Sequence, residues 1–360
     1  MKTILSIVPR LPPAIDGVGD YADLLAKALA DRHNVSTQFI ACDPLQPVES
    51  VGELNPIQLP QRSSDSLLAI LNRCHHDTLL LHYVGYGYAK RGCPQWLVDA
   101  ICTWRQAKVS RKIVTMFHEV YASSNRPWSS QFWTSSTQQK IARDLANCSD
   151  LVLTSTQIYT DKITKLSPKH DGKIQILPIF STIGECASST PLAARKPWLV
   201  TFGNTKFRQD IYTNSIAQLT TICQQLEIEE IYDIGNNSAE IVRSIPQVKV
   251  NAMGILPAPR ISQIFSEARV GFLNYPIAYL AKSTIFAAYA SHKLLPVFDR
   301  ANIDRNQDGI IFNQHYWSFQ TAKASIDFAT AQKIADNADR WYSTHNLAQT
   351  ADRLANLIIN

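Results

Sequence analysis

The chain has 360 residues and a formal net charge of +5, with 45% hydrophobic and 18% charged residues. This composition excludes a disordered chain, and the length suits two domains of roughly 150 to 200 residues. No lysine- or arginine-rich run marks a nucleic-acid surface.

Apolar runs typical of buried strands alternate with helical patterns in the first half of the chain. We predict strands at 4–8, 35–41, 78–83, 112–117, 151–154 and 174–177, and helices at 21–30, 95–107 and 136–147. Strands separated by helices indicate parallel sheets built from β-α-β units.

A small, polar, Pro-bearing stretch at 183–197 interrupts the pattern and predicts a linker. Strands are then predicted at 198–202, 230–234, 248–251, 270–273 and 294–298. Helices are predicted at 211–226, 261–268 and 283–291, followed by a helical stretch at 330–359. We therefore expect an α/β fold with a first domain at 1–185, a linker at 186–197, a second domain at 198–335 and a final helix at 336–360.

The loop between the first strand and the first helix carries Gly17 and Gly19, and Asp20 is predicted to be the N-cap. A helix N-terminus behind such a loop presents free N–H groups and a positive dipole end to an anion. Gly17, Gly19 and Ala22 also satisfy G-x-G-x-x-A, but a long Pro-containing stretch precedes them, unlike in dinucleotide-binding loops. Phosphate or sugar contact is favoured over an ordinary loop or a dinucleotide site.

Several stretches, in this order, resemble GT-B glycosyltransferases, especially the family 4 group. They are Gly17-Val18-Gly19-Asp20-Tyr21, Phe117-His118-Glu119, Thr201-Phe202-Gly203 with Lys206 and Arg208, Ile234-Gly235, Met253-Gly254-Ile255-Leu256, Tyr275-Pro276, Lys282-Ser283-Thr284 and Leu295-Pro296-Val297. The resemblance implies two Rossmann-like domains facing a cleft, with the acceptor mainly on the first domain and a nucleotide-sugar donor on the second. It also implies retention at the anomeric carbon and a final helix that returns to the first domain.

The sequence departs from that family at one motif. Family 4 members usually carry a Glu-x7-Glu pair near the donor sugar and the ribose, whereas residues 279–288 contain no glutamate. Lys282, Ser283 and Thr284 stand at the helix start instead. A non-catalytic nucleotide-sugar-binding protein is therefore a second hypothesis.

A donor diphosphate requires preorganised positive charge, because its leaving group gains negative charge as the glycosidic bond breaks. Lys282 beside a Ser/Thr cap, and the basic residues after Gly203, suit this role. The chain has no Asp-x-Asp pair, so a metal-clamped diphosphate is disfavoured and no metal is expected. The donor-binding candidates are Gly17, Gly19, Gly203, Lys206, Arg208, Gly254, Lys282, Ser283 and Thr284.

Two further groups follow predicted strands, where ligand clefts of α/β proteins form. His118 and Glu119 are the catalytic candidates, since imidazole and carboxylate exchange protons near neutral pH. His82, Tyr83 and Tyr86 are acceptor-binding candidates, because aromatic faces pack against sugar C–H groups.

Other signals lead to alternatives or are set aside. A third hypothesis is an epimerase of GT-B architecture, or an NAD-dependent enzyme with Asp43 on the adenosine ribose. Residues 304–315 open like a calcium loop but place His315 where a bidentate carboxylate is required. Cys74-His75-His76 has no partner pair for a metal. No cofactor is expected beyond the nucleotide-sugar co-substrate, and the acceptor could be a sugar, a lipid or a polysaccharide.

Localisation is predicted from what the chain lacks. The segment 1–10 is too short in its apolar part to be a signal peptide, and the most apolar segment, 270–290, contains Asn274, Pro276 and Lys282. The seven cysteines form no C-x-x-C pair and predict free thiols in a reducing compartment. We expect a cytoplasmic protein, compatible with a peripheral position on the inner face of a membrane.

Overall fold

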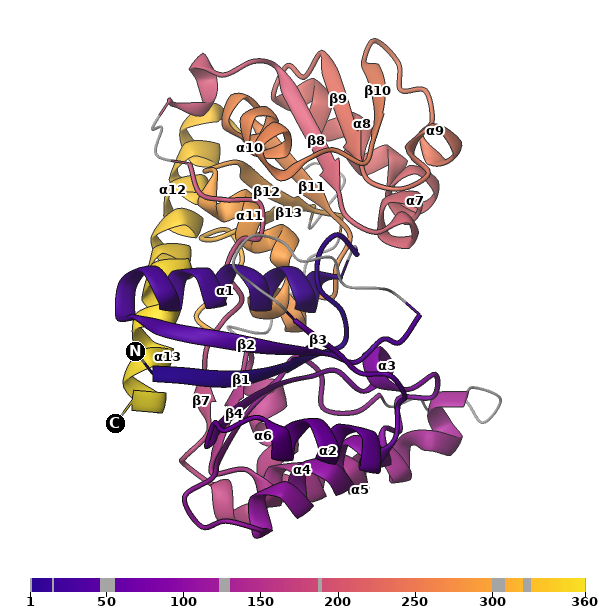
Figure 1. Cartoon of the computed structure of the whole chain (residues 1–360). Helices are drawn as coiled ribbons and strands as arrows, with labels where there is room; N and C mark the ends of the chain where they lie inside the picture. Colours follow the sequence, from indigo (N-terminus) through magenta and orange to yellow (C-terminus); the bar gives the residue numbers. More distant parts are fainter. Residues whose placement is uncertain are drawn as a thin grey trace. The chain divides into compact units, whose positions relative to one another are not determined.

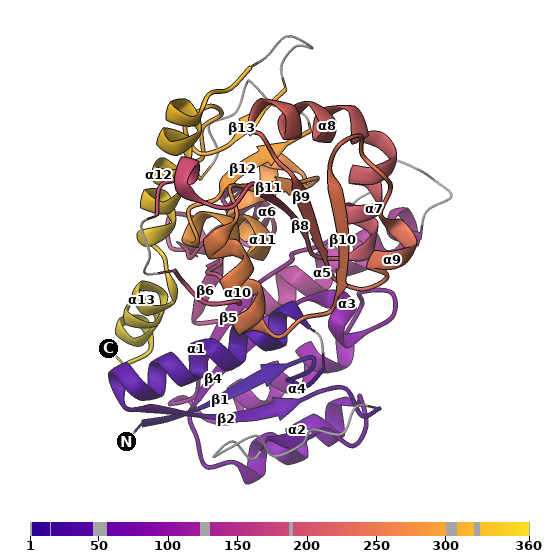
Figure 2. The same ribbon diagram turned by 90° about the horizontal axis from the view of Figure 1, so that it is seen from above.

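The computed structural model describes residues 2–14, 16–45, 56–122, 130–186, 190–299, 308–319 and 325–359. The chain forms two compact units (Figures 1 and 2). Unit 1 comprises Met1–Pro178 together with Leu347–Asn360, and unit 2 comprises Ile179–Asn346. The chain thus enters unit 2 ahead of the expected linker at 186–197. The end of the chain belongs to unit 1.

Unit 1 contains a seven-stranded parallel sheet in the order β3-β2-β1-β4-β5-β6-β7. Its central strands are buried on both faces, as the continuous apolar runs predict. The strands are β1 (Lys2–Val8), β2 (Val35–Ala41), β3 (Ile57–Gln58), β4 (Thr78–Tyr83), β5 (Lys112–Phe117), β6 (Leu151–Thr154) and β7 (Gln175–Ile176).

Helices cover both faces of the unit 1 sheet (Figure 1). On one face α1 (Gly17–His33) packs against α13 (Leu347–Ile359). On the other face lie α2 (Ser64–Arg73), α4 (Gln95–Gln106), α5 (Ser130–Cys148) and α6 (Gln157–Leu166), each packed on the next. A short helix, α3 (Gly85–Tyr88), follows β4, and a 3-10 turn, η1 (Pro168–His170), precedes β7.

Unit 2 contains a six-stranded parallel sheet in the order β10-β9-β8-β11-β12-β13. Alternate residues of β8 point to opposite faces, so that Leu199 joins one hydrophobic cluster and Val200 the other. The strands are β8 (Trp198–Phe202), β9 (Glu230–Ile234), β10 (Lys249–Gly254), β11 (Val270–Leu273), β12 (Leu295–Phe298) and β13 (Trp317–Ser318).

The helices of unit 2 divide between the same two clusters. The first cluster includes side chains of α7 (Thr205–Asn214), α8 (Ile216–Gln225) and α12 (Phe328–Ser343). The second includes side chains of α10 (Ala258–Glu267) and α11 (Thr284–Ser291). The shorter elements are η2 (Leu192–Ala194), α9 (Ser238–Ile241) and η3 (Ile277–Lys282).

Two predicted helices are each divided in the structure. The predicted helix at 211–226 becomes α7 and α8, which break at Ser215, whose hydroxyl donates to Asp299 Oδ2 at 2.6 Å. The helical stretch at 330–359 becomes α12 in unit 2 and α13 in unit 1. Helical periodicity continues across both breaks, so the pattern alone does not reveal them.

Each sheet has a topological switch point, where successive connections leave in opposite directions. It lies between β1 and β4 in unit 1 and between β8 and β11 in unit 2. In open parallel sheets ligands bind in the crevice outside the carboxyl ends of the strands at this point. The loops after β1 and β4, and those after β8 and β11, are therefore the places to search for a site.

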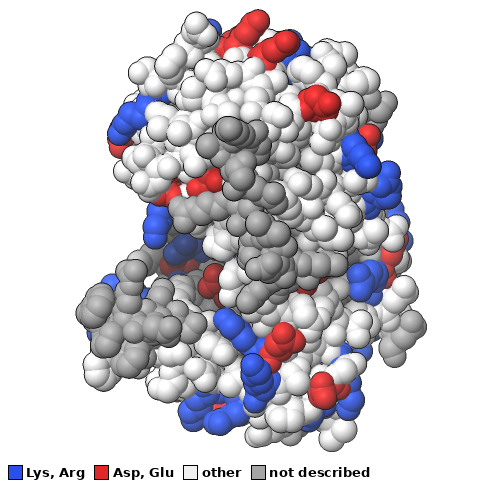
Figure 3. All heavy atoms as spheres, turned by 180° about the vertical axis from the view of Figure 1, so that it is seen from behind, with Lys and Arg blue, Asp and Glu red and all other residues white. Residues whose placement is uncertain are grey.

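Among the described residues on the face drawn in Figure 3, basic and acidic side chains are interspersed among uncharged ones. Among the helices that the structure describes, none is long and apolar enough to cross a membrane.

Candidate functional site

The loop after β1 and the start of α1 border the switch point of unit 1. Asp16 caps α1, because its extended backbone lets the carboxylate accept from the Val18 N–H at 3.0 Å. The prediction of Asp20 as the cap is therefore wrong, since Asp20 lies inside the first turn. Burial, with Asp16 and Asp23 nearby, raises the pKa of Asp20 to about 6.

The two glycines of this loop differ in their surroundings. A Cβ on Gly19 would lie 2.4 Å from the Arg10 carbonyl oxygen, so close backbone packing requires glycine there. A Cβ on Gly17 would meet nothing within 4 Å. Of the two, Gly17 has the open surroundings that a ligand requires.

A buried histidine pair lies at the carboxyl edge of the unit 1 sheet. His82 is near the end of β4 and His118 follows β5, so neighbouring strands bring them together. His82 Nδ1 and His118 Nε2 are 3.1 Å apart, and the Tyr21 ring packs edge-on against both imidazoles. Burial lowers the pKa of His82 to about 3, so this imidazole is neutral and the pair shares an N–H hydrogen bond.

The remaining candidates of unit 1 lie in different environments. The Tyr83 ring is 1% exposed and packs edge-to-face on Phe117, so the predicted acceptor contact is replaced by core packing. Tyr86, in α3, is 41% exposed, and its hydroxyl accepts from Gln138 Nε2 at 3.3 Å. Glu119 is half-buried directly after His118.

In unit 2 the loop after β8 passes close to neighbouring groups. Gly203 adopts φ +116°, and a Cβ there would lie 2.3 Å from Ile285 Cδ1. Asn204 then caps α7 by accepting from the Phe207 N–H at 3.0 Å. Glycine is therefore required for this tight entry into α7.

Arg208 is fully buried beneath that loop. Its guanidinium forms an ion pair with Asp233 and donates to the carbonyl oxygens of Gly203, at 2.8 Å, and Asn236. The expected contact with a donor diphosphate is thus replaced by contacts that hold the loops after β8 and β9. The sequence carried a signal for this, since Arg208 shares the buried face of α7 with Ile211 and Tyr212.

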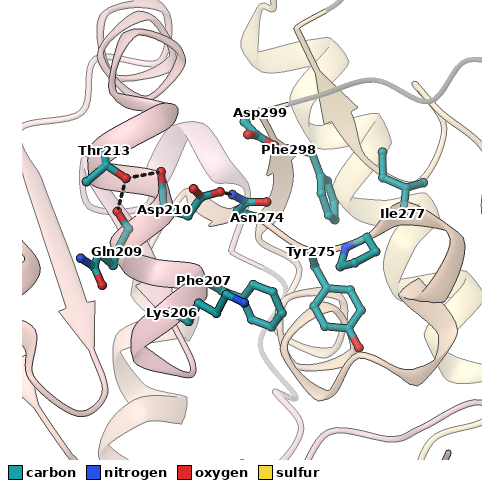
Figure 4. A pocket seen from close by; sticks show the side chains of 11 residues that line it. Lys206, Phe207, Gln209, Asp210, Thr213, Asn274, Tyr275, Ile277, Phe298 and Asp299 are labelled. Carbon is teal, nitrogen blue, oxygen red and sulfur yellow. Dashed lines mark hydrogen bonds between the residues drawn. The ribbon is translucent and has the colours of Figure 1, made fainter. Parts of the chain in front are cut away.

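A pocket of about 780 Å³ opens at the switch point of unit 2, among the residues that follow β8, β11 and β12 (Figure 4). The Phe207 and Tyr275 rings pack edge-to-face with their centroids 5.4 Å apart. The Asp210 carboxylate accepts from the Asn274 amide, and Asp299 also lines the pocket. Lys206, on the first turn of α7, supplies a cation.

The turn between η3 and α11 carries the other predicted cation. Lys282 ends η3, and its Nζ lies 6.0 Å from the centroid of the Tyr279 ring. Ser283 caps α11 by accepting from the Phe286 N–H at 3.2 Å, and Thr284 is the first residue of that helix. Gly254, at the end of β10, adopts φ +67° with open space around it. None of these four residues lines the 780 Å³ pocket.

Sequence reasoning missed most of this pocket. Lys206 is the predicted site residue among its lining residues, and those that were not predicted include Phe207, Asp210, Asn274, Tyr275 and Asp299. Asn274 and Tyr275 directly follow β11, and Asp299 directly follows β12. Position at a strand's carboxyl end was the available signal, but the strand order that brings these ends together is not visible in the sequence.

Two alternatives can be compared with the structure. The Asp43 carboxylate, which an NAD site would need for a ribose, is held by Arg10 at 2.7 Å and faces Arg62 at 3.6 Å. Within the described residues, no group of three or more His, Cys, Asp or Glu side chains could hold a metal. The calcium-like segment at 304–315 lies partly outside the described residues.

No protein-family model matches the chain, and no curated protein matches it. Solved structures, in contrast, match over the whole length. A sucrose-phosphate synthase from Thermosynechococcus elongatus has a TM-score of 0.64 at 14% identity, covering 99% of this chain and 98% of that one. WaaG, a glycosyltransferase involved in lipopolysaccharide biosynthesis, has a TM-score of 0.60 at 12% identity, covering 99% of both chains.

A third match is a UDP-GlcNAc 2-epimerase from Neisseria meningitidis bound to UDP-GlcNAc. Its TM-score is 0.61 at 9% identity, and the match covers 100% of both chains. These likenesses, with the two parallel-sheet α/β units, show that the chain has the fold of the GT-B glycosyltransferases. The same architecture serves an epimerase, so the fold alone leaves the reaction undetermined.

Proposed function

We propose that this protein transfers a glycosyl group from a nucleoside-diphosphate sugar, without a metal ion, to an acceptor. The observation that carries the proposal is the unit 2 pocket, which lies at the switch point of the second parallel sheet of a GT-B fold. Similar structures that are complexes with UDP support a uridine nucleotide as the first donor to test.

The chemistry of the pocket suits a sugar nucleotide. Asp210, Asp299 and Asn274 offer acceptors for hydroxyl groups, and the Phe207 and Tyr275 rings offer apolar faces for a sugar or base. Lys206 supplies one positive charge for a phosphate. The sequence lacks the Glu-x7-Glu pair that lies near the donor sugar and the ribose in family 4 members. We propose that Asp210 and Asp299 bind the hydroxyl groups of the donor in its place.

The diphosphate requires further donors. The N-terminus of α11 presents backbone N–H groups, and Lys282 precedes its Ser283 cap. We propose that Lys282, Ser283 and Thr284 bind the phosphates, and that the open Gly254 turn admits another part of the donor. Gly203 and Arg208 act by positioning, because Arg208 holds the Gly203 carbonyl from beneath.

On unit 1 we propose the acceptor and proton-transfer groups. His118 and Glu119 stand at the carboxyl edge, and His82 fixes the His118 ring through their shared hydrogen bond. Tyr86 offers an exposed ring, and Gly17 an open approach to the start of α1. Retention at the anomeric carbon follows from the family resemblance and is checked by NMR of the product anomer.

The first experiment is a thermal-shift screen against uridine, guanosine, adenosine, cytidine and thymidine diphosphates and their sugar conjugates. A ligand at 100 times its Kd stabilises the folded state by about 2.7 kcal/mol. We expect a shift with one nucleotide family and turnover of its sugar conjugate. Binding without turnover favours a non-catalytic protein. A changed configuration at one carbon of the donor sugar, without transfer of that sugar, favours an epimerase. A response to NADH alone contradicts the proposal.

Residue assignments are tested by isothermal titration with the nucleotide that the screen identifies. Lys282→Ala and Lys206→Ala are each expected to weaken donor binding by about 1.5–3 kcal/mol, the range for a hydrogen bond to a charged group. Lys333→Ala, at an exposed position of α12, is the matched control. Unchanged affinity in a folded Lys282→Ala variant removes Lys282 from the site.

A further inference from the structure

Two of the seven cysteines lie together at one place in unit 1. Cys102 is in α4 and Cys148 is the last residue of α5, and these helices pack against each other. Both thiols line the same surface pocket, and they lie close enough for each to shift the pKa of the other. The two residues are 46 positions apart, so only the fold brings them together.

The pair is accessible to small molecules. Both thiols are half-buried and line a surface pocket of about 580 Å³. Arg105, Lys169, Asp144 and Asp150 line the same pocket, and Asp150 forms an ion pair with Arg105 at 2.9 Å. Cys42 and Cys223, in contrast, are buried in the cores of their units.

The two sulfurs differ in character. The neighbouring Cys102 thiol lowers the pKa of Cys148, and Arg105 and Lys169 also lower it, whereas burial and Asp150 raise it. The neighbouring Cys148 thiol and burial raise the pKa of Cys102. Arg105 and Lys169, which line the pocket beside Cys148, favour its thiolate, and the thiolate is the nucleophile in disulfide exchange.

We propose that Cys102 and Cys148 form a reversible thiol–disulfide site that reacts with low-molecular-weight disulfides such as glutathione disulfide. The Cys148 thiolate attacks the disulfide and expels one glutathione thiolate, which leaves a mixed disulfide. The Cys102 thiol then loses its proton and attacks Cys148 Sγ, which expels the second glutathione. Two protein thiols are oxidised, and one glutathione disulfide is reduced to two thiols.

This site lies away from the proposed proton-transfer groups of unit 1. The C-terminal ends of α4 and α5 precede the starts of β5 and β6, so the pair lies at the amino edge of the sheet, opposite the His82–His118 pair. The bond would close a loop between residues 102 and 148, which restricts the unfolded chain. The oxidised protein is therefore expected to unfold at a higher temperature than the reduced protein, and a dithiol reductant is expected to reverse the shift.

The test uses the full chain in glutathione buffers of graded redox potential, followed by alkylation, trypsin digestion and mass spectrometry. Cys102 and Cys93 share the tryptic peptide 92–105, and Cys148 lies in 144–162. We expect these two peptides to be linked in the wild type and in Cys93→Ser, and unlinked in Cys102→Ser and Cys148→Ser. The number of thiols that can be alkylated should fall from seven to five, because the disulfide consumes those of Cys102 and Cys148.

The single variants also test the order of the steps. Cys102→Ser is expected to retain one glutathione on Cys148, because the resolving thiol is missing. Glutathione retained on Cys102 in Cys148→Ser, with none on Cys148 in Cys102→Ser, overturns that order. No linked peptide in the most oxidising buffer, or a link lost in Cys93→Ser, overturns the site itself.

Discussion

At the scale of single residues, Arg208 shows how a basic side chain beside a candidate site can serve the structure. Its charge is fully buried against Asp233, and its other donors hold carbonyl groups of two loops. The same region places Lys206 at the exposed start of α7, where it lines the pocket. Lys206 and Arg208 are only two positions apart in the sequence, but they lie on different faces of α7 and therefore have different roles.

The Arg208–Asp233 pair makes a stability prediction. Arg208→Met leaves the Asp233 carboxylate buried without its partner and is expected to cost about 3–5 kcal/mol of unfolding free energy. Urea denaturation measures the loss. Adding Asp233→Asn removes the uncompensated charge and should restore part of the lost unfolding free energy. A double variant that is less stable than Arg208→Met would argue that the buried charge is not the cause of the loss.

The buried His82 makes a pH prediction. Its pKa is lowered to about 3 in the folded state, against the usual 6.5, so the unfolded state binds more protons between these values. The stabilising contribution of neutral His82 is present above pH 6.5 and is lost as pH falls toward 3. The raised pKa of Asp20 has the opposite effect, because it makes the folded state more stable as pH falls from about 6 to 3.8.

We expect His82→Asn to be less stable than the wild type at pH 7, with a gap that narrows toward pH 5. Subtracting the two proteins' unfolding free energies at each pH removes the contribution of Asp20, which both contain. Denaturation at pH 7, 6 and 5 provides the data. A gap that stays constant across this range would mean that His82 does not titrate on unfolding.

At the scale of elements, the position of α13 could not be expected from its place in the sequence. It follows unit 2 in sequence but packs on α1 of unit 1, with Thr350, Ala351, Leu354, Ala355 and Ile358 buried. Arg32 and His33 of α1 contact Asp352, and Lys112 Nζ donates to the Leu357 carbonyl at 3.0 Å. The helix is thus an integral part of unit 1.

Shortening a buried side chain of α13 tests this packing. Leu354→Ala is expected to destabilise unit 1 by about 2–5 kcal/mol, because it removes buried methyl groups and leaves a cavity. Thermal and urea unfolding measure the loss, with exposed Asn356→Ala as the matched control. Equal stability of the two variants would indicate that α13 does not pack as described.

At the scale of the whole molecule, the two units differ in chain continuity. Unit 2 is one segment, Ile179–Asn346, whereas unit 1 requires both ends of the chain. We expect a fragment of residues 179–346 to fold alone with a cooperative thermal transition. A fragment of residues 1–178 should unfold more easily than one in which residues 347–360 are attached, because the α13 face of α1 is then uncovered.

The fragment of unit 2 also localises the donor. If the pocket between the ends of β8, β11 and β12 binds the nucleotide, the 179–346 fragment should retain nucleotide binding measured by titration. Binding that requires the complete chain, with the fragment folded, places essential contacts outside unit 2.

The sequence by itself determined the α/β class and most of the strands, because buried parallel strands require continuous apolar runs and the helices between them require amphipathic periodicity. It also placed His82, His118 and Lys206 at the carboxyl ends of strands or just after them. Tertiary structure alone decided the strand order, the breaks at Ser215 and after α12, the burial of Arg208 and Tyr83, and the meeting of Cys102 with Cys148. The reason is physical: periodicity is a local property of the chain, whereas pockets and side-chain pairs arise between segments that only packing brings together.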